Sequence, residues 1–155
     1  MNKIQLEDMA PQVIGEILPP LPTFDYSALA PEAAAHMRDT ADRIRMRHRQ
    51  HVAAIIETGR DLLAVKQRLL HGQFGAWLQA EFSMTERTAL NYMRTAAEFG
   101  GKSEIVSDLP PAALYTLVAP STPASVKQAV IERLETGDRV TSHEVRDLVR
   151  EAKVT

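Results

Sequence analysis

The sequence predicts an all-α protein, and three observations support that prediction. Long stretches are rich in Ala, Leu, Glu, Arg and Gln, the residues that favour helix. Apolar residues recur at spacings of three and four, which is the period of an amphipathic helix. Helix start and stop signals separate these stretches, while seven glycines and few β-branched runs leave little material for a sheet.

Residues 1–31 are expected to form a proline-rich, disordered arm. They hold five of the nine prolines, including Pro19, Pro20 and Pro22. Each proline removes a backbone donor and restricts the residue before it, so no long helix is expected here. A short helical turn around residues 4–17 still fits the pattern. The remaining residues, 32–155, are expected to form one helical domain.

A long helix is predicted over residues 32–70, where Gly59 is the one helix-breaking residue. An apolar seam follows a heptad-like repeat through Ala41, Ile44, His48, His51, Ile55, Thr58, Leu62, Val65 and Leu69. Its first half is narrow and polar, whereas Val52, Ile56, Leu63 and Leu70 broaden the second half. We therefore expect the second half to enter the core and the first half to project or to pair with another chain. Gly59 indicates a close helix crossing or a bend.

Residues 73–99 are predicted to form a helix-turn-helix. His71-Gly72 ends the long helix, a first helix covers about 73–82, and Gly100-Gly101 ends the second helix, 85–99. Thr85 is suited to cap the second helix, although Ser83 with Glu86 offers an alternative start. The apolar residues expected to hold the two helices are Leu78, Phe82, Met84, Ala89, Leu90 and Met93, and Phe74 and Trp77 are expected in the core.

Three shorter helices are predicted after the helix-turn-helix, at about 109–119, 123–136 and 142–152. Pro110-Pro111 and Thr122-Pro123 are typical of first turns. Thr141 and Glu144 form a capping box, in which each side chain satisfies an exposed N–H of the other residue. Gly137 ends the helix before it.

The second helix of the helix-turn-helix carries the candidate DNA-binding residues. If residues 89, 90, 93, 96 and 97 face inward, the outer face holds Arg87, Thr88, Asn91, Arg94 and Thr95. Arginine can read guanine, asparagine can read adenine, and a threonine methyl can meet thymine. The candidates on this helix are Thr85, Arg87, Thr88, Asn91 and Arg94. Ser83 in place of a turn glycine and Gln79 in place of a small residue depart from the usual helix-turn-helix pattern.

A second group of candidates lies in the long helix. Residues 38–70 carry eight Lys and Arg against four acids, a net of +4, although the whole chain has a net charge of −2. The densest part holds Arg43, Arg45, Arg47 and Arg49. Because phosphate binding depends on local charge, these arginines are candidate phosphate contacts. A solvated helix face is the alternative interpretation.

Several function classes find no support in the sequence. The absence of cysteine excludes disulfides, zinc knuckles and thiol nucleophiles. There is no Gly-rich phosphate loop, HExxH or GxSxG motif, so no enzyme, cofactor or small-molecule substrate is expected. His48 and His51 lack the further ligands of a metal site. With no apolar run of about 18 residues and no signal peptide, a cytoplasmic protein without a membrane segment is expected.

Residues 55–99 resemble a bacterial family of unknown function that occurs on phages, plasmids and integrative elements. The residues that carry the resemblance are Gly59, Lys66, His71, Gly72, Phe74, Trp77, Phe82, Arg87, Thr88, Ala89 and Met93. More loosely, residues 84–152 look like the DNA-binding region of ParB-type partition proteins, through Leu114 to Pro120 and Val140 to Val149. The ParB nucleotide-binding region is lacking. Both resemblances imply DNA binding in a mobile-element setting.

The sequence therefore predicts a DNA-binding transcriptional regulator, or a partition or replication accessory factor, of a mobile element. Its partner is expected to be double-stranded DNA, bound by a homodimer that pairs through the long helix. The alternative is a helical protein–protein adaptor or anti-activator that does not bind DNA. That alternative rests on the modest charge of residues 85–99, which carry two Arg and two Glu.

Overall fold

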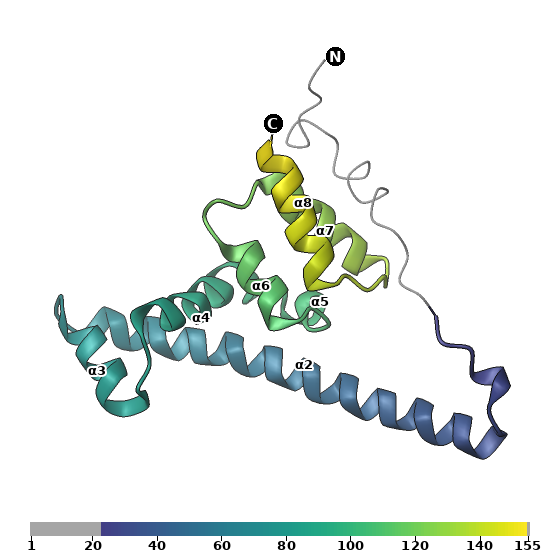
Figure 1. The fold of residues 1–155 in the computed structure, drawn as a ribbon. Coiled ribbons are helices and arrows are strands. Elements are labelled where there is room, and N and C mark those ends of the chain that lie inside the picture. Colours follow the sequence, from purple (N-terminus) through teal and green to yellow (C-terminus); the bar gives the residue numbers. More distant parts are fainter. Residues whose placement is uncertain (1–22, 155) are drawn as a thin grey trace, which may run out of the picture.

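The computed structural model describes residues 23–154, and all regular structure in that range is helical (Figure 1). The all-α prediction is confirmed. A 3-10 turn, η2 (Tyr26–Ala28), precedes seven α-helices within the described range: α2 (Pro31–Arg68), α3 (Gln73–Phe82), α4 (Glu86–Phe99), α5 (Ser103–Val106), α6 (Pro111–Val118), α7 (Ala124–Glu135) and α8 (Ser142–Val154).

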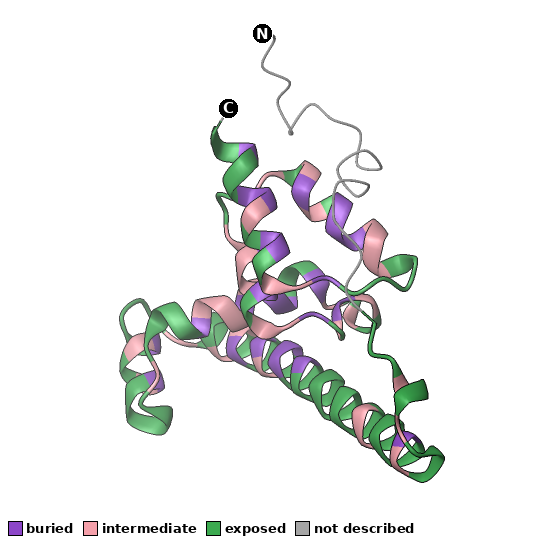
Figure 2. Cartoon of the chain, turned by 45° about the vertical axis from the view of Figure 1, so that its right-hand side comes forward, coloured by how far each residue is buried: buried purple, intermediate pink, exposed green. Residues whose placement is uncertain are grey.

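Helix α2 is a rod of 38 residues, about 57 Å long at 1.5 Å per residue. Pro31 occupies its first turn, where the missing N–H costs nothing. Apart from Ala34, its buried residues lie in the second half, at Val52, Ile55, Ile56, Gly59 and Leu62. The first half projects beyond the other helices, with Ile44, His48 and His51 exposed (Figure 2). The division between a packed and a projecting half is confirmed.

Helix α4 lies antiparallel against α2, and the two backbones approach most closely at Gly59. A Cβ atom at Gly59 would overlap the carbonyl oxygen of Tyr92 and lie 2.7 Å from the Cβ of Ala96. Beside this contact, the Arg60 guanidinium donates to the carbonyl oxygen of Gly100 over 2.6 Å. Gly59 therefore marks a close helix crossing, which is the first of the two predicted roles.

Two apolar clusters form the core. The larger one joins Val52 and Ile56 of α2 to the end of α4 and to helices α5–α8. The smaller one joins Leu62 of α2 to α3 and α4 through Phe74, Leu78, Ala89 and Met93. Helix α4 contributes to both clusters, so it ties the helix-turn-helix to the C-terminal helices.

The predicted helix-turn-helix is present as α3, a tight turn and α4. Ser83 ends α3 in the left-handed region, at φ +52°, where glycine is the usual residue. The N–H groups of Ser83 and Met84 donate to the carbonyls of Gln79 and Leu78, over 3.1 and 3.2 Å. The polypeptide therefore turns in the predicted place despite the serine.

The three predicted C-terminal helices are confirmed as α6, α7 and α8. The capping box is also confirmed: the backbone N–H of Thr141 donates to a Glu144 carboxylate oxygen over 2.7 Å, and the N–H of Glu144 donates to the Thr141 hydroxyl over 3.2 Å. The prediction missed α5, because four residues are too few for a recognisable apolar period.

Some detailed expectations were wrong. Helix α2 ends at Arg68, and Leu70 is exposed beyond it instead of widening the stripe. Phe82 is also exposed, with its ring edge-on to Trp77 at 5.2 Å, and Trp77 itself is only half-buried. Trp77 packs against the edge of the cluster that contains Phe74 and Leu78, whereas Phe82 lies at the exposed end of α3. Most of the predicted proline-rich arm lies outside the described residues.

Candidate nucleic-acid interface

The start of α4 is fixed by its capping residue. The Thr85 hydroxyl oxygen accepts a hydrogen bond from the backbone N–H of Thr88 over 3.2 Å and also lies 3.1 Å from the Thr88 hydroxyl. Thr85 therefore caps α4, and the alternative helix start at Ser83 is not observed. Thr85 and Thr88 are both exposed. The hydroxyl of Thr85 therefore holds the start of the helix.

The predicted outer face of α4 is only partly open to solvent. Arg87 is exposed, whereas Asn91 and Arg94 are half-buried. The prediction for Thr95 was wrong: this residue is fully buried, and its hydroxyl donates to the carbonyl oxygen of Asn91 over 2.7 Å. Ala97, which was expected to face inward, is exposed. Contacts with both α2 and α6 cover a wider arc of α4 than a two-helix unit would.

Three of the predicted residues meet in one groove, which lies between α4, α6 and α8. It has a volume of about 400 Å³. Arg87, Asn91 and Arg94 of α4 form one wall of this groove. The opposite side is lined by Tyr115 and Thr116 of α6, the loop residues Ala119, Ser121 and Thr122, and Val149 and Lys153 of α8. We call it the α4–α8 groove.

The α4–α8 groove is lined by basic residues without a balancing acid. Its charged lining residues are Arg87, Arg94 and Lys153. The two glutamates of α4 lie elsewhere, because the Glu86 carboxylate rests against Gly75 of α3 and Glu98 pairs with Lys127 of α7 over 3.0 Å. The modest total charge of α4 therefore hides a local excess of positive charge on this side.

A neutral phenol completes the lining. Burial, together with the charge of the neighbouring Tyr92 and a hydrogen bond with it, raises the pKa of Tyr115 to about 12. The two rings pack edge to face, with centroids 6.3 Å apart. Tyr115 consequently stays uncharged at physiological pH and adds no negative charge to the α4–α8 groove.

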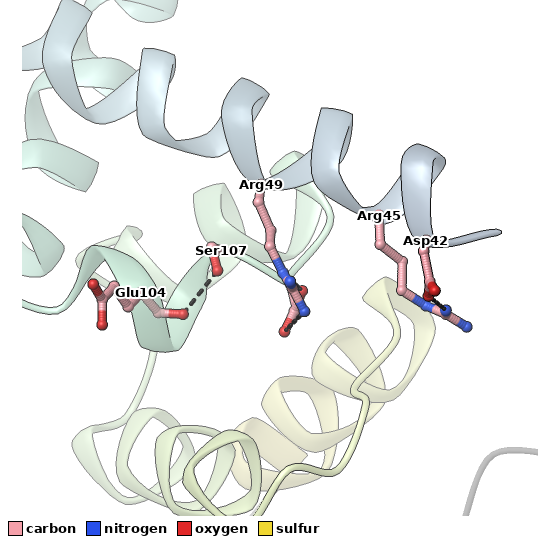
Figure 3. Close-up of polar contacts among 6 residues, drawn as sticks. Asp42, Arg45, Arg49, Glu104 and Ser107 are labelled. Carbon is pink, nitrogen blue, oxygen red and sulfur yellow. Dashed lines mark hydrogen bonds and ion pairs between the residues drawn. The ribbon is translucent and has the colours of Figure 1, made fainter. Parts of the chain in front are cut away.

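The arginines of α2 do not form one basic surface, and two of them, Arg45 and Arg49, are held in ion pairs (Figure 3). Arg45 pairs with Asp42 over 2.9 Å, and Arg49 pairs with Asp108, in the loop after α5, over 2.7 Å. The hydrogen bond and the charge of Asp108 raise the pKa of Arg49. At 100° per residue, Arg43 and Arg47 lie on the opposite side of α2 from Arg45 and Arg49. The predicted phosphate-binding cluster is thus divided between two faces and partly neutralised.

The two groups of candidates are also far apart. The start of α4 lies beside Lys66 and Leu69, near the end of α2. Arg47 precedes Lys66 by 19 positions, which correspond to about 30 Å along the helix axis. A single phosphate cannot contact both groups, so they would have to meet separate parts of a duplex.

No sequence pattern indicates that Lys153 belongs with the α4 arginines. It lies one residue beyond the predicted end of the last helix, and its ammonium donates to the Ser121 hydroxyl over 3.1 Å. A four-residue spacing from Val149 places Lys153 on the packed side of α8. The spacing indicates a shared site only when it is known that α4, α6 and α8 line one groove.

Comparison with known proteins gives one match. A family model described as a protein of unknown function, DUF3102, matches residues 35–148. The chain belongs to the DUF3102 family. The DUF3102 match begins in the first turns of α2 and ends in α8, so it includes the smaller apolar cluster, most of the larger one and the candidate residues of α4. No curated protein matches the chain, and no solved structure does.

The resemblance to a family of unknown function is confirmed at the level of DUF3102. The similarity to ParB-type proteins and the mobile-element setting stay predictions. Among residues 23–154, no helix is both long enough and apolar enough to cross a bilayer. In the same range, no group of three or more His, Asp and Glu side chains is arranged to hold a metal ion.

Proposed function

We propose that this DUF3102 protein is a non-enzymatic regulator or accessory factor of a mobile element that binds double-stranded DNA through α4. The observation that carries the proposal is the side of α4 with Arg87, Asn91 and Arg94. Neither arginine makes an ion pair within the described residues, and both glutamates of the helix lie elsewhere. The loose similarity to ParB-type DNA-binding regions agrees with this proposal.

The geometry of α4 favours base recognition by the residues of its first turns. Recognition helices contact base edges mainly through residues near their N-terminal end. Arg87 and Thr88 protrude from that end of α4, while Asn91 and Arg94 lie deeper beside α6 and α8. Arg87 can donate two hydrogen bonds to guanine, and Asn91 can pair with adenine where the groove edge allows it.

The projecting half of α2 supports a symmetric dimer. Met37 and Ile44 are exposed there, and helical spacing places them on the same side as the buried Ile55 and Leu62. The side of α2 that is buried in the core therefore carries further apolar residues past the edge of the folded domain, with the exposed His48 and His51 between the two parts. A second copy of the chain offers the identical stripe, so two copies can cover each other along this half of α2. Helix-turn-helix dimers read two half-sites about one DNA turn apart.

A protein–protein adaptor is the second candidate function, and one observation favours it. Leu70 and Phe82 are large apolar residues with exposed fractions of 74% and 54%, and both flank α3. Contiguous apolar patches mark docking surfaces, and a partner that covers α3 would bury both of these side chains. An adaptor would use this end of the molecule and would leave Arg87 and Asn91 without a role.

Fluorescence anisotropy with bulk duplex DNA at low and high salt tests the first proposal. We expect binding that weakens with salt. Once a preferred site is selected from genomic fragments, Arg87→Ala and Asn91→Ala should each lose about 1–3 kcal/mol of binding free energy at that site, because each removes a base contact. Arg139→Ala, which removes an exposed arginine of the loop before α8, is the matched control and should bind as the parent does.

An adaptor predicts a different result. The parent protein would then bind no DNA even at low salt, and the Arg87 and Asn91 variants would keep its behaviour. Unchanged affinity of both variants for the preferred site would likewise show that these two residues do not read the bases.

A further inference from the structure

We propose that the α4–α8 groove holds one phosphate group of the DNA backbone, and that Lys153 of α8 is a phosphate-binding residue. This inference rests on the proposed DNA binding and adds the C-terminal helix to the interface. It assigns Arg94 and Lys153 a shared phosphate, while Arg87 at the border of the groove adds positive charge and faces the bases that it would read.

The placement of Lys153 is the first argument. Its ammonium donates to the Ser121 hydroxyl over 3.1 Å, and Lys153 lines the same groove as Arg87 and Arg94. Three cations from two helices thus border one hollow without an acid among its lining residues. Grouped like charges repel one another, so an anion bound between them would relieve that repulsion.

The acids of α8 do not neutralise the groove. Asp147 pairs with Arg150 over 2.7 Å and with His143 over 3.0 Å, on its own helix. Glu144 is held in the capping box with Thr141. Neither residue lines the groove, and neither does Glu151, the third acid of α8. The positive charge is therefore available to a ligand from solution.

The hydroxyl groups supply a hydrogen-bond donor as well. Thr116 and Thr122 donate to backbone carbonyls, those of Ala112 and Thr116 respectively. The Ser121 oxygen accepts from Lys153, which leaves its own hydrogen for another acceptor. Phosphate oxygens accept several hydrogen bonds at once, so Arg94, Lys153 and one hydroxyl donor match a phosphate well.

The position of the groove favours a backbone phosphate over a free one. Arg87 and Lys153 are exposed at its border, while Asn91 and Arg94 are half-buried within it. A strand that lies with its bases toward Arg87 and Thr88 passes along this border. Helix-turn-helix proteins fix their register on DNA through phosphate contacts of this kind, which carry no sequence information.

The test compares Lys153→Gln with Arg146→Gln. Both change one exposed cation of α8, but Arg146 does not line the groove. Anisotropy with a duplex of fixed sequence is measured across a salt series. For Lys153→Gln we expect about tenfold weaker binding at 0.1 M salt, and a slope of log K against log salt that is smaller by about one. Arg146→Gln should match the parent in both quantities.

The outcomes separate this inference from the proposed function. If the parent binds DNA and Lys153→Gln keeps its affinity and its salt slope, the phosphate site is wrong and the proposed function stands. If the parent binds no DNA, both are wrong. The other possible ligand of the groove is a free phosphate ion, and NMR titration of the parent with inorganic phosphate tests it. Saturable shifts at Arg94 and Lys153, together with unchanged DNA binding by Lys153→Gln, would assign the groove to a free phosphate and would overturn the backbone site.

Discussion

At the scale of single residues, the turn between α3 and α4 carries a backbone conformation that its side chain disfavours. Ser83 has φ +52°, in the left-handed region, and is the one described non-glycine residue with a positive φ. The conformation costs about 1 kcal/mol or more for a residue with a Cβ atom. The hydrogen bonds of the turn and the packing of Leu78 and Met84 on either side hold it in place.

Ser83→Gly should therefore stabilise the protein. Glycine removes the left-handed penalty, and its greater flexibility in the unfolded chain offsets part of that gain, so we expect an increase of about 0.5–1 kcal/mol in the free energy of unfolding. Urea denaturation followed by circular dichroism measures it. Gly137→Ala is the reverse control. Gly137 has φ +87° and no atom would touch an added Cβ, so alanine there should lower the free energy of unfolding by about 1 kcal/mol through backbone strain alone. Destabilisation by Ser83→Gly would contradict this account of the turn.

At the scale of helices, the crossing of α2 and α4 determines where the helix-turn-helix sits. Gly59 lets the backbone of α2 approach the backbone of α4 at Tyr92 and the methyl group of Ala96. Glycine inside a helix costs about 1 kcal/mol relative to alanine. The close contact, with Thr95 and Ala96 buried beside it, compensates for that cost.

Gly59→Ala should destabilise the protein, although alanine is the better helix former. Its methyl group would overlap the Tyr92 carbonyl, a backbone atom that cannot move alone, so α4 has to shift away. We expect a loss of about 1–3 kcal/mol. Ala64→Gly, at an exposed site of α2, is the control and should lose about 1 kcal/mol through helix propensity alone. A gain in stability from Gly59→Ala would show that the crossing is loose.

Helices could be predicted from sequence because their signals are local. Thr85, the Thr141–Glu144 box and Gly137 act within a few residues of themselves, and the observed ends agree with them. The surroundings of α4 could not be predicted in the same way. Asn91 is half-buried in a groove that α6 and α8 help to line, and Thr95 is fully buried on a helix that contacts both α2 and α6. Helical period alone does not show which neighbours a third or fourth helix provides. Lys153 could not be predicted for the same reason, because only the packing of α8 brings it to the groove beside α4.

At the scale of the whole molecule, helix α2 contributes to both apolar clusters and extends beyond them. The smaller cluster holds α3 and α4 near one end of α2, and the larger one holds the C-terminal helices over its middle (Figure 1). The pair between Arg49 and Asp108 marks the border, because no residue of α2 between Ala34 and that point is buried. The first five turns of α2 therefore gain little from the chain's own packing.

A second copy would stabilise that part of α2, and one pair of variants tests it. Ile44 and Met46 are both exposed, yet they lie about 200° apart around the helix, with Ile44 on the side of the core stripe. Ile44→Glu should bury an unpaired charge between two copies, at a cost of about 3 kcal/mol, and so raise the dimer dissociation constant about 100-fold. Met46→Glu places the same charge on the opposite face and should leave the dimer intact.

Sedimentation equilibrium at micromolar concentration and pH 7.5 distinguishes the variants, and circular dichroism checks that α2 keeps its helicity. We expect a dimer for the parent and for Met46→Glu, and a monomer for Ile44→Glu with weakened affinity for a two-half-site duplex. Each half-site then has to be bound separately, which removes the gain of a linked second contact. A parent that is monomeric and still binds DNA with full affinity would leave the projecting half of α2 as a solitary arm, and the dimer would be wrong.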